Sequence, residues 1–130
     1  MNALLDSSFV IDLLNELAEA QPGPAIRWLQ QNRKAKLWIS AVTMAEVLEG
    51  AQDVDYVRSF LGRFHWQGIH HAHALRVALL QKKARQCMGE SDAWQAAVTL
   101  EMKGVLVGHD PKAFSRLGAA YQDHWVVVGK

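Results

Sequence analysis

The stretch from Ala3 to Leu14 constrains the fold of this chain more than any other. An apolar run stops abruptly at Asp6, two serines follow, and apolar residues then recur at helical spacing. The pattern predicts a buried strand that ends in a carboxylate and leads directly into a helix, which Ser7 or Ser8 is able to cap. In open α/β sheets, ligands bind beyond the carboxyl ends of the strands. Asp6 is therefore placed for chemistry.

Strand-like apolar runs and amphipathic helical patterns alternate along the rest of the chain. Beyond the first strand we expect strands at residues 37–39, 105–107 and 124–128, with a short one within 65–69. Helices are expected at residues 7–20, 24–29, 40–50, 56–64, 73–86, 91–104 and 110–114. Strands separated by helices give a parallel sheet with helices on both faces. We therefore predict a three-layer α/β/α fold, built as one domain over residues 1–130.

Acidic side chains gather at one edge of this predicted sheet. Right-handed crossovers bring the carboxyl ends of all the strands to that edge. Asp6 and Asp110 end strands there, while Glu46 and Asp92 lie in helices that start from it. Carboxylates this close repel one another unless a cation neutralises them. Oxygen ligands suit a hard divalent ion such as Mg²⁺ or Mn²⁺, which can hold a phosphate and activate a water. The chemistry indicated is phosphodiester hydrolysis.

Each of these acids also has a purely structural explanation. Glu46 can be a solvated side chain beside a buried helical stripe, which is the commoner role of a helical Glu. Asp92 lies in the first turn of a predicted helix, where the helix dipole favours an acid. Glu90 either adds a ligand or belongs to a solvated loop, and we favour the loop. The metal-site hypothesis therefore depends on whether the acids converge in three dimensions.

The overall charge limits how this chain can bind nucleic acid. A net charge of +1 excludes a polybasic coat and leaves room for a modest basic groove. Lys82, Lys83 and Arg85 cluster at the expected end of a helix. Their interaction with the helix dipole explains them as well as contacts to RNA phosphates beside an active site do. Both interpretations stay open.

Three histidines and one cysteine bear on metal binding and on compartment. His70, His71 and His73 match neither structural zinc spacing nor the His-Glu-x-x-His pattern, so we expect solvated histidines at a helix start. Cys87 is the only cysteine, which excludes an internal disulfide and fits a reducing cytosol. No apolar run approaches the ~20 residues of a membrane-spanning helix, and the first residues lack the features of a signal peptide. We expect a cytoplasmic protein.

Four blocks of the sequence, in order, resemble those of the PIN-domain family. The first is L-L-D-S-S-F-V-I-D-L-L, a strand ending in Asp6. The second is S-A-V-T-M-A-E-V-L-E-G, with Glu46 as its acid. The third and fourth are joined in S-D-A-W-Q-A-A-V-T-L-E-M-K-G-V-L-V-G-H-D-P-K-A-F, where Asp92 and Asp110 take the acidic positions and Phe114 the aromatic one. The resemblance spans almost the whole chain, and four ordered blocks are far more specific than one.

In size and layout the chain is similar to the VapC-type toxins of bacterial type II toxin–antitoxin pairs. The resemblance implies an endoribonuclease that uses Mg²⁺ or Mn²⁺ to hydrolyse RNA, and it implies a partner antitoxin and a homodimer. Its catalytic and metal-binding residues would be Asp6, Glu46, Asp92 and Asp110. Ser7 is expected to support Asp6, since its hydroxyl can donate a hydrogen bond to the carboxylate. Five tryptophans in so small a domain also favour an interface.

The sequence departs from the family pattern at two positions. Ser8 stands where Asn is usual, and Gly108 stands where Thr or Ser usually precedes the fourth acid. Losses around a metal site cost about 10–100-fold in affinity or activity. We therefore expect weak cleavage of single-stranded or loop RNA, with a water in place of the hydroxyl absent at Gly108. A Gly108→Thr variant is expected to match or exceed this activity if the backbone tolerates a side chain.

Three alternatives were weighed against the leading hypothesis. The two departures are compatible with a PIN domain that binds RNA or a protein without cutting, although the four retained acids argue against it, since an idle cluster is an electrostatic cost. A haloacid-dehalogenase-type phosphatase needs a second Asp two residues after Asp6, where this chain has Ser8. A phosphoacceptor receiver domain needs an acidic pair at the first strand and a Lys after a late strand, and neither is present.

Overall fold

The computed structural model describes residues 1–83 and 88–126 of the chain. These residues form a five-stranded, all-parallel sheet in the order β3-β2-β1-β4-β5. The strands are β1 (Asn2–Leu5), β2 (Lys36–Ser40), β3 (His65–Gln67), β4 (Val105–Gly108) and β5 (Tyr121–Asp123). The central strand β1 pairs with β2 on one side and β4 on the other, with Leu4 opposite both Trp38 and Leu106.

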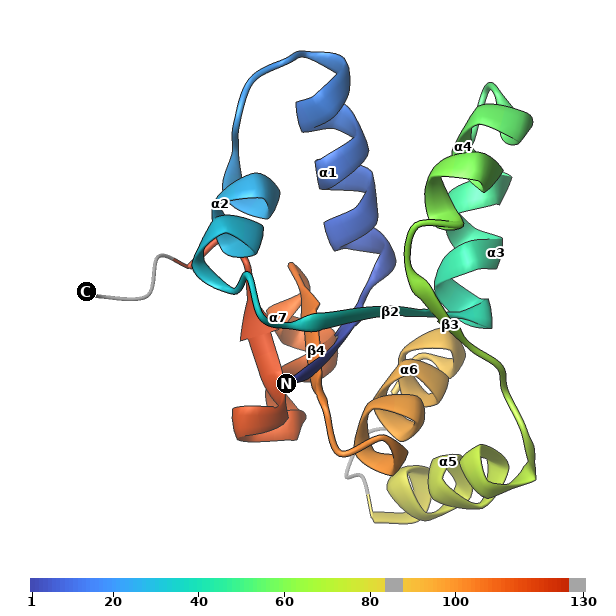
Figure 1. Cartoon of the computed structure of the whole chain (residues 1–130). Coiled ribbons are helices and arrows are strands. Elements are labelled where there is room, and N and C mark those ends of the chain that lie inside the picture. Colours follow the sequence, from blue (N-terminus) through green and yellow to red (C-terminus); the bar gives the residue numbers. More distant parts are fainter. Residues whose placement is uncertain (84–87, 127–130) are drawn as a thin grey trace.

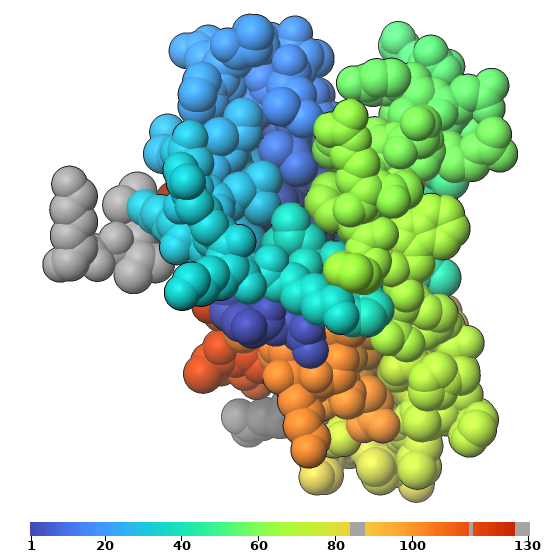
Figure 2. All heavy atoms as spheres, viewed as in Figure 1, coloured from blue at the N-terminus to red at the C-terminus, as the bar shows by residue number. Residues whose placement is uncertain are grey.

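Helices cover both faces of this sheet (Figure 1). They are α1 (Ser7–Ala18), α2 (Pro24–Gln31), α3 (Ala41–Glu49), α4 (Val54–Leu61), α5 (His71–Lys83), α6 (Glu90–Glu101), α7 (Pro111–Phe114) and the 3₁₀ helix η1 (Ser115–Ala120). In the space-filling view, β2 crosses the visible face between α1 and α2 above and α6 and α5 below (Figure 2). The predicted three-layer α/β/α architecture is confirmed.

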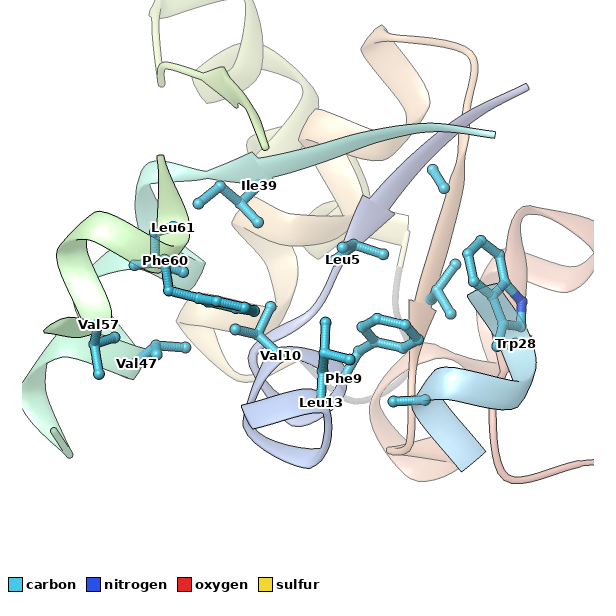
Figure 3. Close-up of a cluster of buried hydrophobic side chains, with 13 residues drawn as sticks. Leu5, Phe9, Val10, Leu13, Trp28, Ile39, Val47, Val57, Phe60 and Leu61 are labelled. Atoms are coloured by element: carbon cyan, nitrogen blue, oxygen red, sulfur yellow. The ribbon is translucent and has the colours of Figure 1, made fainter. Parts of the chain in front are cut away.

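Alternation along β1 divides the core between the two faces of the sheet. Ala3 and Leu5 contribute to the larger cluster with α1, α2, α3 and α4, while Leu4 joins a smaller cluster with α6 and α7. In the larger cluster, the Phe9 ring meets Trp28 edge-on, with centroids 5.6 Å apart (Figure 3). All three β1 side chains are fully buried. Asp6, the next residue, is thereby held at the edge of a rigid strand.

A buried carboxylate joins α1 to α2. Glu16, which is 8% exposed, accepts backbone hydrogen bonds from Gly23 at 2.8 Å, from Ala25 at 2.9 Å and from Ile26 at 2.9 Å. These amides surround the N-terminus of α2, where the helix leaves backbone donors unpaired and its dipole favours negative charge. A Cβ on Gly23 would lie 2.7 Å from the Glu16 carboxyl carbon, so the turn needs glycine there.

The last predicted strand is wrong in position. β5 forms at Tyr121–Asp123, whereas His124, Trp125 and Val126 lie in a turn; Val127 and Val128 fall outside the described residues. An edge strand with one neighbour needs little hydrophobicity, so the largely polar segment Tyr121–Asp123 can form it. His124 instead folds back and packs against the Phe9 ring, with centroids 4.8 Å apart.

Helix α5 is more exposed than its sequence pattern suggested. Leu75 and Leu79 are 65% and 46% exposed, and the helix is fastened to α6 by an ion pair in which Arg76 donates two hydrogen bonds to Glu101. His73 corrects another expectation, because it is buried rather than solvated. Its Nδ1 accepts a hydrogen bond from the His70 backbone N–H at 3.1 Å. Across the described ranges, the helices are too short or too polar to serve as a membrane span.

Candidate active site

The four predicted acids lie around the carboxyl ends of the central strands. Asp6 follows β1 and Asp110 follows β4, while Glu46 lies in α3 and Asp92 in the first turn of α6. Burial raises the pKa of Asp92, and the charges of Asp110, Asp6 and Glu46, in that order, raise it further. All three carboxylates therefore act on Asp92 at short range, and the cluster is electrostatically unfavourable when no cation is bound.

Asp6 is the most enclosed member of this cluster. Its side chain is 7% exposed, and both of its carboxylate oxygens accept hydrogen bonds. The Ser8 hydroxyl donates to Oδ2 at 2.9 Å, and the Gln95 side-chain amide donates to Oδ1 at 3.2 Å. We call these two donors and their acceptor the Asp6 clamp. Both donors are neutral, so the clamp fixes the direction of the carboxylate and leaves its charge uncompensated.

Gln95 is the residue that sequence analysis missed. It is 1% exposed, and its amide nitrogen also donates to Thr43 Oγ1 at 2.7 Å, while its amide oxygen accepts a hydrogen bond from the Ser40 hydroxyl. Thr43 in turn donates to the backbone oxygen of Leu5 at 3.1 Å. The side chain of Gln95 thus uses both donors and its acceptor to join β1, α3 and α6. The available signal was an isolated polar residue within the alanine-rich buried face of α6.

The two serines after Asp6 have different partners from those expected. The hydroxyl that holds Asp6 belongs to Ser8, whereas Ser7 donates to Glu46 Oε1 at 2.7 Å. Ser7 and Ser8 are neighbours at the N-terminus of α1, so their side chains point in different directions. Which of the two reaches Asp6 depends on the three-dimensional position of Glu46, and the sequence does not give that position. Both serines therefore orient acids of the cluster.

Gly108 leaves the space that the Ser8 hydroxyl occupies. A Cβ at residue 108 would lie 2.8 Å from Asp6 Cβ and 3.0 Å from Ser8 Oγ. Ser8 Oγ also accepts the His109 backbone N–H at 2.9 Å, so one hydroxyl links β1, α1 and the end of β4. The two departures from the family pattern are thus complementary: Ser8 supplies a hydroxyl beside Asp6 at a place where Gly108 has no side chain. The condition attached to Gly108→Thr, room for a side chain, is not met.

A pocket of about 520 Å³ opens beside the acids and is lined by both acidic and basic side chains. Its lining includes Asp92 and Asp110 on one hand and Lys112 and Arg116 on the other. Sequence analysis missed both cations and pointed to the end of α5 instead. There Lys83 lines a neighbouring cavity of about 260 Å³ together with Arg116, and Lys82 is exposed. Arg85 lies outside the described residues.

The acidic cluster was tested as a possible metal site. Within residues 1–83 and 88–126, no group of three or more His, Cys, Asp or Glu side chains is arranged to hold an ion. The donor chemistry nevertheless fits a hard divalent cation, because the cluster offers carboxylate oxygens. Burial raises the pKa of Asp92 most, and the neighbouring carboxylates raise it further. The histidines near the start of α5 form no such group, since His73 is turned inward.

Comparisons with known proteins agree with this fold. A model of the PIN domain matches residues 3–120. The ribonuclease VapC2 of Haemophilus influenzae is 26% identical over 133 residues, covering 95% of this chain and 97% of that protein. VapBC-1 from nontypeable Haemophilus influenzae has a TM-score of 0.72 at 25% identity, covering 95% of this chain and 98% of that one. A toxin–antitoxin complex from Klebsiella pneumoniae has a TM-score of 0.72 at 22% identity, covering 96% and 99%.

Proposed function

This chain belongs to the PIN domain family, and on that premise we propose that it is a divalent-cation-dependent endoribonuclease, the toxin of a type II toxin–antitoxin pair. The observation that carries the proposal is the placement of Asp6 and Asp110 after the neighbouring strands β1 and β4, with Glu46 and Asp92 in the adjoining helices α3 and α6. Burial raises the pKa of Asp92, and the charges of the other three acids raise it further. A cluster of this kind is costly unless it holds a cation. Similarity to a protein named ribonuclease VapC2 supports RNA as the substrate.

Asp6, Asp92 and Asp110 would hold the cation, with Glu46 beside them. A bound Mg²⁺ or Mn²⁺ supplies charge neutralisation and a more acidic bound water. The Asp6 clamp keeps one carboxylate in a fixed direction, and Ser7 does the same for Glu46. Lys112 and Arg116, which line the pocket beside Asp92 and Asp110, would bind the phosphates that flank the scissile bond. Lys83 would extend this contact from α5.

The partners follow from the same comparisons. Two of the similar structures are described as VapBC-1 and as a toxin–antitoxin complex, which supports an antitoxin as the protein partner of this chain. A homodimer remains part of the proposal, because five tryptophans in so small a domain favour an interface. Light scattering at micromolar concentration tests the dimer directly.

The deciding experiment is cleavage of single-stranded and hairpin RNA by the purified protein. We expect cleavage with Mg²⁺ or Mn²⁺, none in EDTA, and none by the Asp92→Asn variant. Glu90→Gln is the matched control, because Glu90 is an exposed acid in the same helical turn. Cleavage that persists in EDTA or survives Asp92→Asn contradicts the proposal. RNA binding without cleavage under every divalent ion assigns the chain to the non-cutting alternative.

A further inference from the structure

Two aromatic rings lie at the edge of the cluster, where β4 and β5 end. The rings of His109 and Trp125 have centroids 4.9 Å apart and planes inclined by 33°. The His109 side chain is 45% exposed and Trp125 is 51% exposed. We refer to these two side chains as the ring pair. Both side chains are about half exposed, in a part of the molecule that the proposed metal chemistry does not use.

The ring pair is held rigidly in spite of its exposure. Asp123 Oδ1 is 2.9 Å from His109 Nδ1 and accepts the Trp125 backbone N–H at 2.9 Å. Asp12 Oδ2 accepts the Trp125 indole N–H at 2.9 Å and lies 2.8 Å from Nε2 of the buried His124. Two carboxylates therefore fix both rings from below. A half-exposed aromatic side chain that is fixed in this way loses little entropy when a ligand stacks on it.

The ring pair is also coupled to the acidic cluster. His109 directly precedes Asp110, and its backbone N–H donates to the Ser8 hydroxyl, which donates to Asp6. The backbone of His109 is therefore two hydrogen bonds from the Asp6 carboxylate. Because His109 and Asp110 are consecutive residues, the ring pair and the acidic cluster share the segment that follows β4.

We propose that the ring pair is a stacking site for an unpaired nucleobase of the RNA substrate, next to the nucleotide whose phosphate reacts. The inference rests on the proposed ribonuclease function and adds where a base is bound. Stacking on an aromatic ring needs an exposed base face, so the site favours single-stranded or looped RNA over a duplex. Every base has such a face, so stacking does not select one base over another. His109 and Trp125 take no part in holding the cation in this proposal.

The test compares two ligands that differ only in their bases. Binding of a short oligoadenylate and of an abasic ribose-phosphate chain of equal length is measured by fluorescence anisotropy, in the Asp92→Asn background to prevent cleavage. Adding Trp125→Ala is expected to weaken oligoadenylate binding about tenfold or more and to leave the abasic chain unchanged. Trp125→Phe, which keeps a ring, should stay within about threefold of the parent.

Trp66→Ala is the matched control, because Trp66 is 52% exposed on β3 at the opposite edge of the sheet and its indole N–H is also hydrogen-bonded. Equal losses for both ligands, or for neither, overturn the stacking site. Unchanged RNA binding with weakened binding of the antitoxin overturns it as well, and identifies a protein-docking surface. If the parent binds neither ligand, the ribonuclease proposal itself fails. If the parent binds RNA and Trp125→Ala binds it equally well, only the stacking site is removed. Thermal melting of each variant excludes unfolding as the cause.

Discussion

Two nearly buried carboxylates lie at opposite ends of helix α1 and differ in their surroundings. Asp6 precedes the helix and is 7% exposed; Glu16 lies in its last turns and is 8% exposed. Glu16 accepts three backbone N–H groups at the start of α2. Asp6 accepts two neutral side-chain donors and faces other acids. Burial alone therefore does not distinguish an acid with a structural role from one that we propose to bind a cation, whereas the groups that surround its charge do.

The two carboxylates differ in how far neighbouring groups compensate their negative charge. Both carboxylates lie at the N-terminus of a helix, but only Glu16 accepts backbone N–H groups there, so Glu16 needs no ligand. Asp6 is the N-cap of α1 and its side chain makes no capping hydrogen bond, and in the proposed function a cation completes the compensation of its charge. We therefore expect substitutions at Glu16 to change stability and substitutions around Asp6 to change activity.

The largest effect is expected from Asp6→Asn. Activity should fall by at least about a hundredfold, because a ligand of the cation is lost. The metal-free protein should be no less stable: the Asn oxygen can accept from Gln95, its NH₂ can donate to Ser8, and repulsion within the cluster decreases. Calorimetry should show that Mg²⁺ raises the melting temperature of the parent but not of the variant. Asp55→Asn, an exposed acid on α4, serves as control. Equal Mg²⁺ responses in parent and Asp6→Asn would remove Asp6 from the site.

Glu16→Ala should give the converse result. Removing the carboxylate leaves three backbone donors at the start of α2 without their partner, which should lower the free energy of unfolding by about 2–4 kcal/mol. Activity per folded molecule should be retained. Urea denaturation measures the loss, and Glu19→Ala, an exposed acid at the same end of α1, should change little. A large loss of activity in a folded Glu16→Ala protein would abolish the distinction between the two acids.

Gly108→Ala should disturb the Asp6 clamp although none of the four acids is substituted. The added Cβ would lie 2.8 Å from Asp6 Cβ and 3.0 Å from Ser8 Oγ, so Asp6 must move. We expect activity to fall about 10–100-fold, in contrast to the equal or higher activity that was expected of Gly108→Thr if the backbone tolerated a side chain. Gly68→Ala is the control, since a Cβ there meets open space.

A double variant tests whether Gly108 and Ser8 act together. Combining Gly108→Ser with Ser8→Ala should cost less activity than the sum of the two single losses, expressed as free energies. Strict additivity would show that the two residues do not share the site.

The smallest effect concerns Asp92 and pH in metal-free buffer. Because its pKa is raised above 3.8, the folded protein binds this proton more tightly than the unfolded chain. The corresponding stability is complete below that ordinary value and is lost as pH rises through the raised pKa. Asp92→Asn should therefore melt above the parent at neutral pH in EDTA, with the two curves converging in acid. Glu90→Gln should show no such pH-dependent difference.

Local patterns were sufficient to predict most of the fold. The apolar run before Asp6, the Ser40 cap and the strand before Gly108 each depend on neighbours in sequence, and each was predicted. The compensation of Glu16 by α2 and the contact of Gln95 with Asp6 join distant segments, and periodicity carries no information about them. The pairing of Ser7 with Glu46 rather than Asp6 depends on how α1 meets α3. The sequence thus placed the four acids after strands or in the adjoining helices, and it missed the side chains that hydrogen-bond to Asp6 and Glu46.

The pairing of β1 with β4 has a consequence for folding during synthesis of the chain. β1 is synthesised before its neighbour β4, which pairs Ala3 with Val105, and the Asp6 backbone N–H donates to the backbone oxygen of Val107. Until that segment emerges, Asp6 has neither its strand partner nor the Ser8–His109 contact, and Asp92 lacks Asp110. A nascent chain that stops before β4 therefore lacks one of the four acids and the contacts that orient another. The proposed nuclease activity can arise only after β4 has been synthesised.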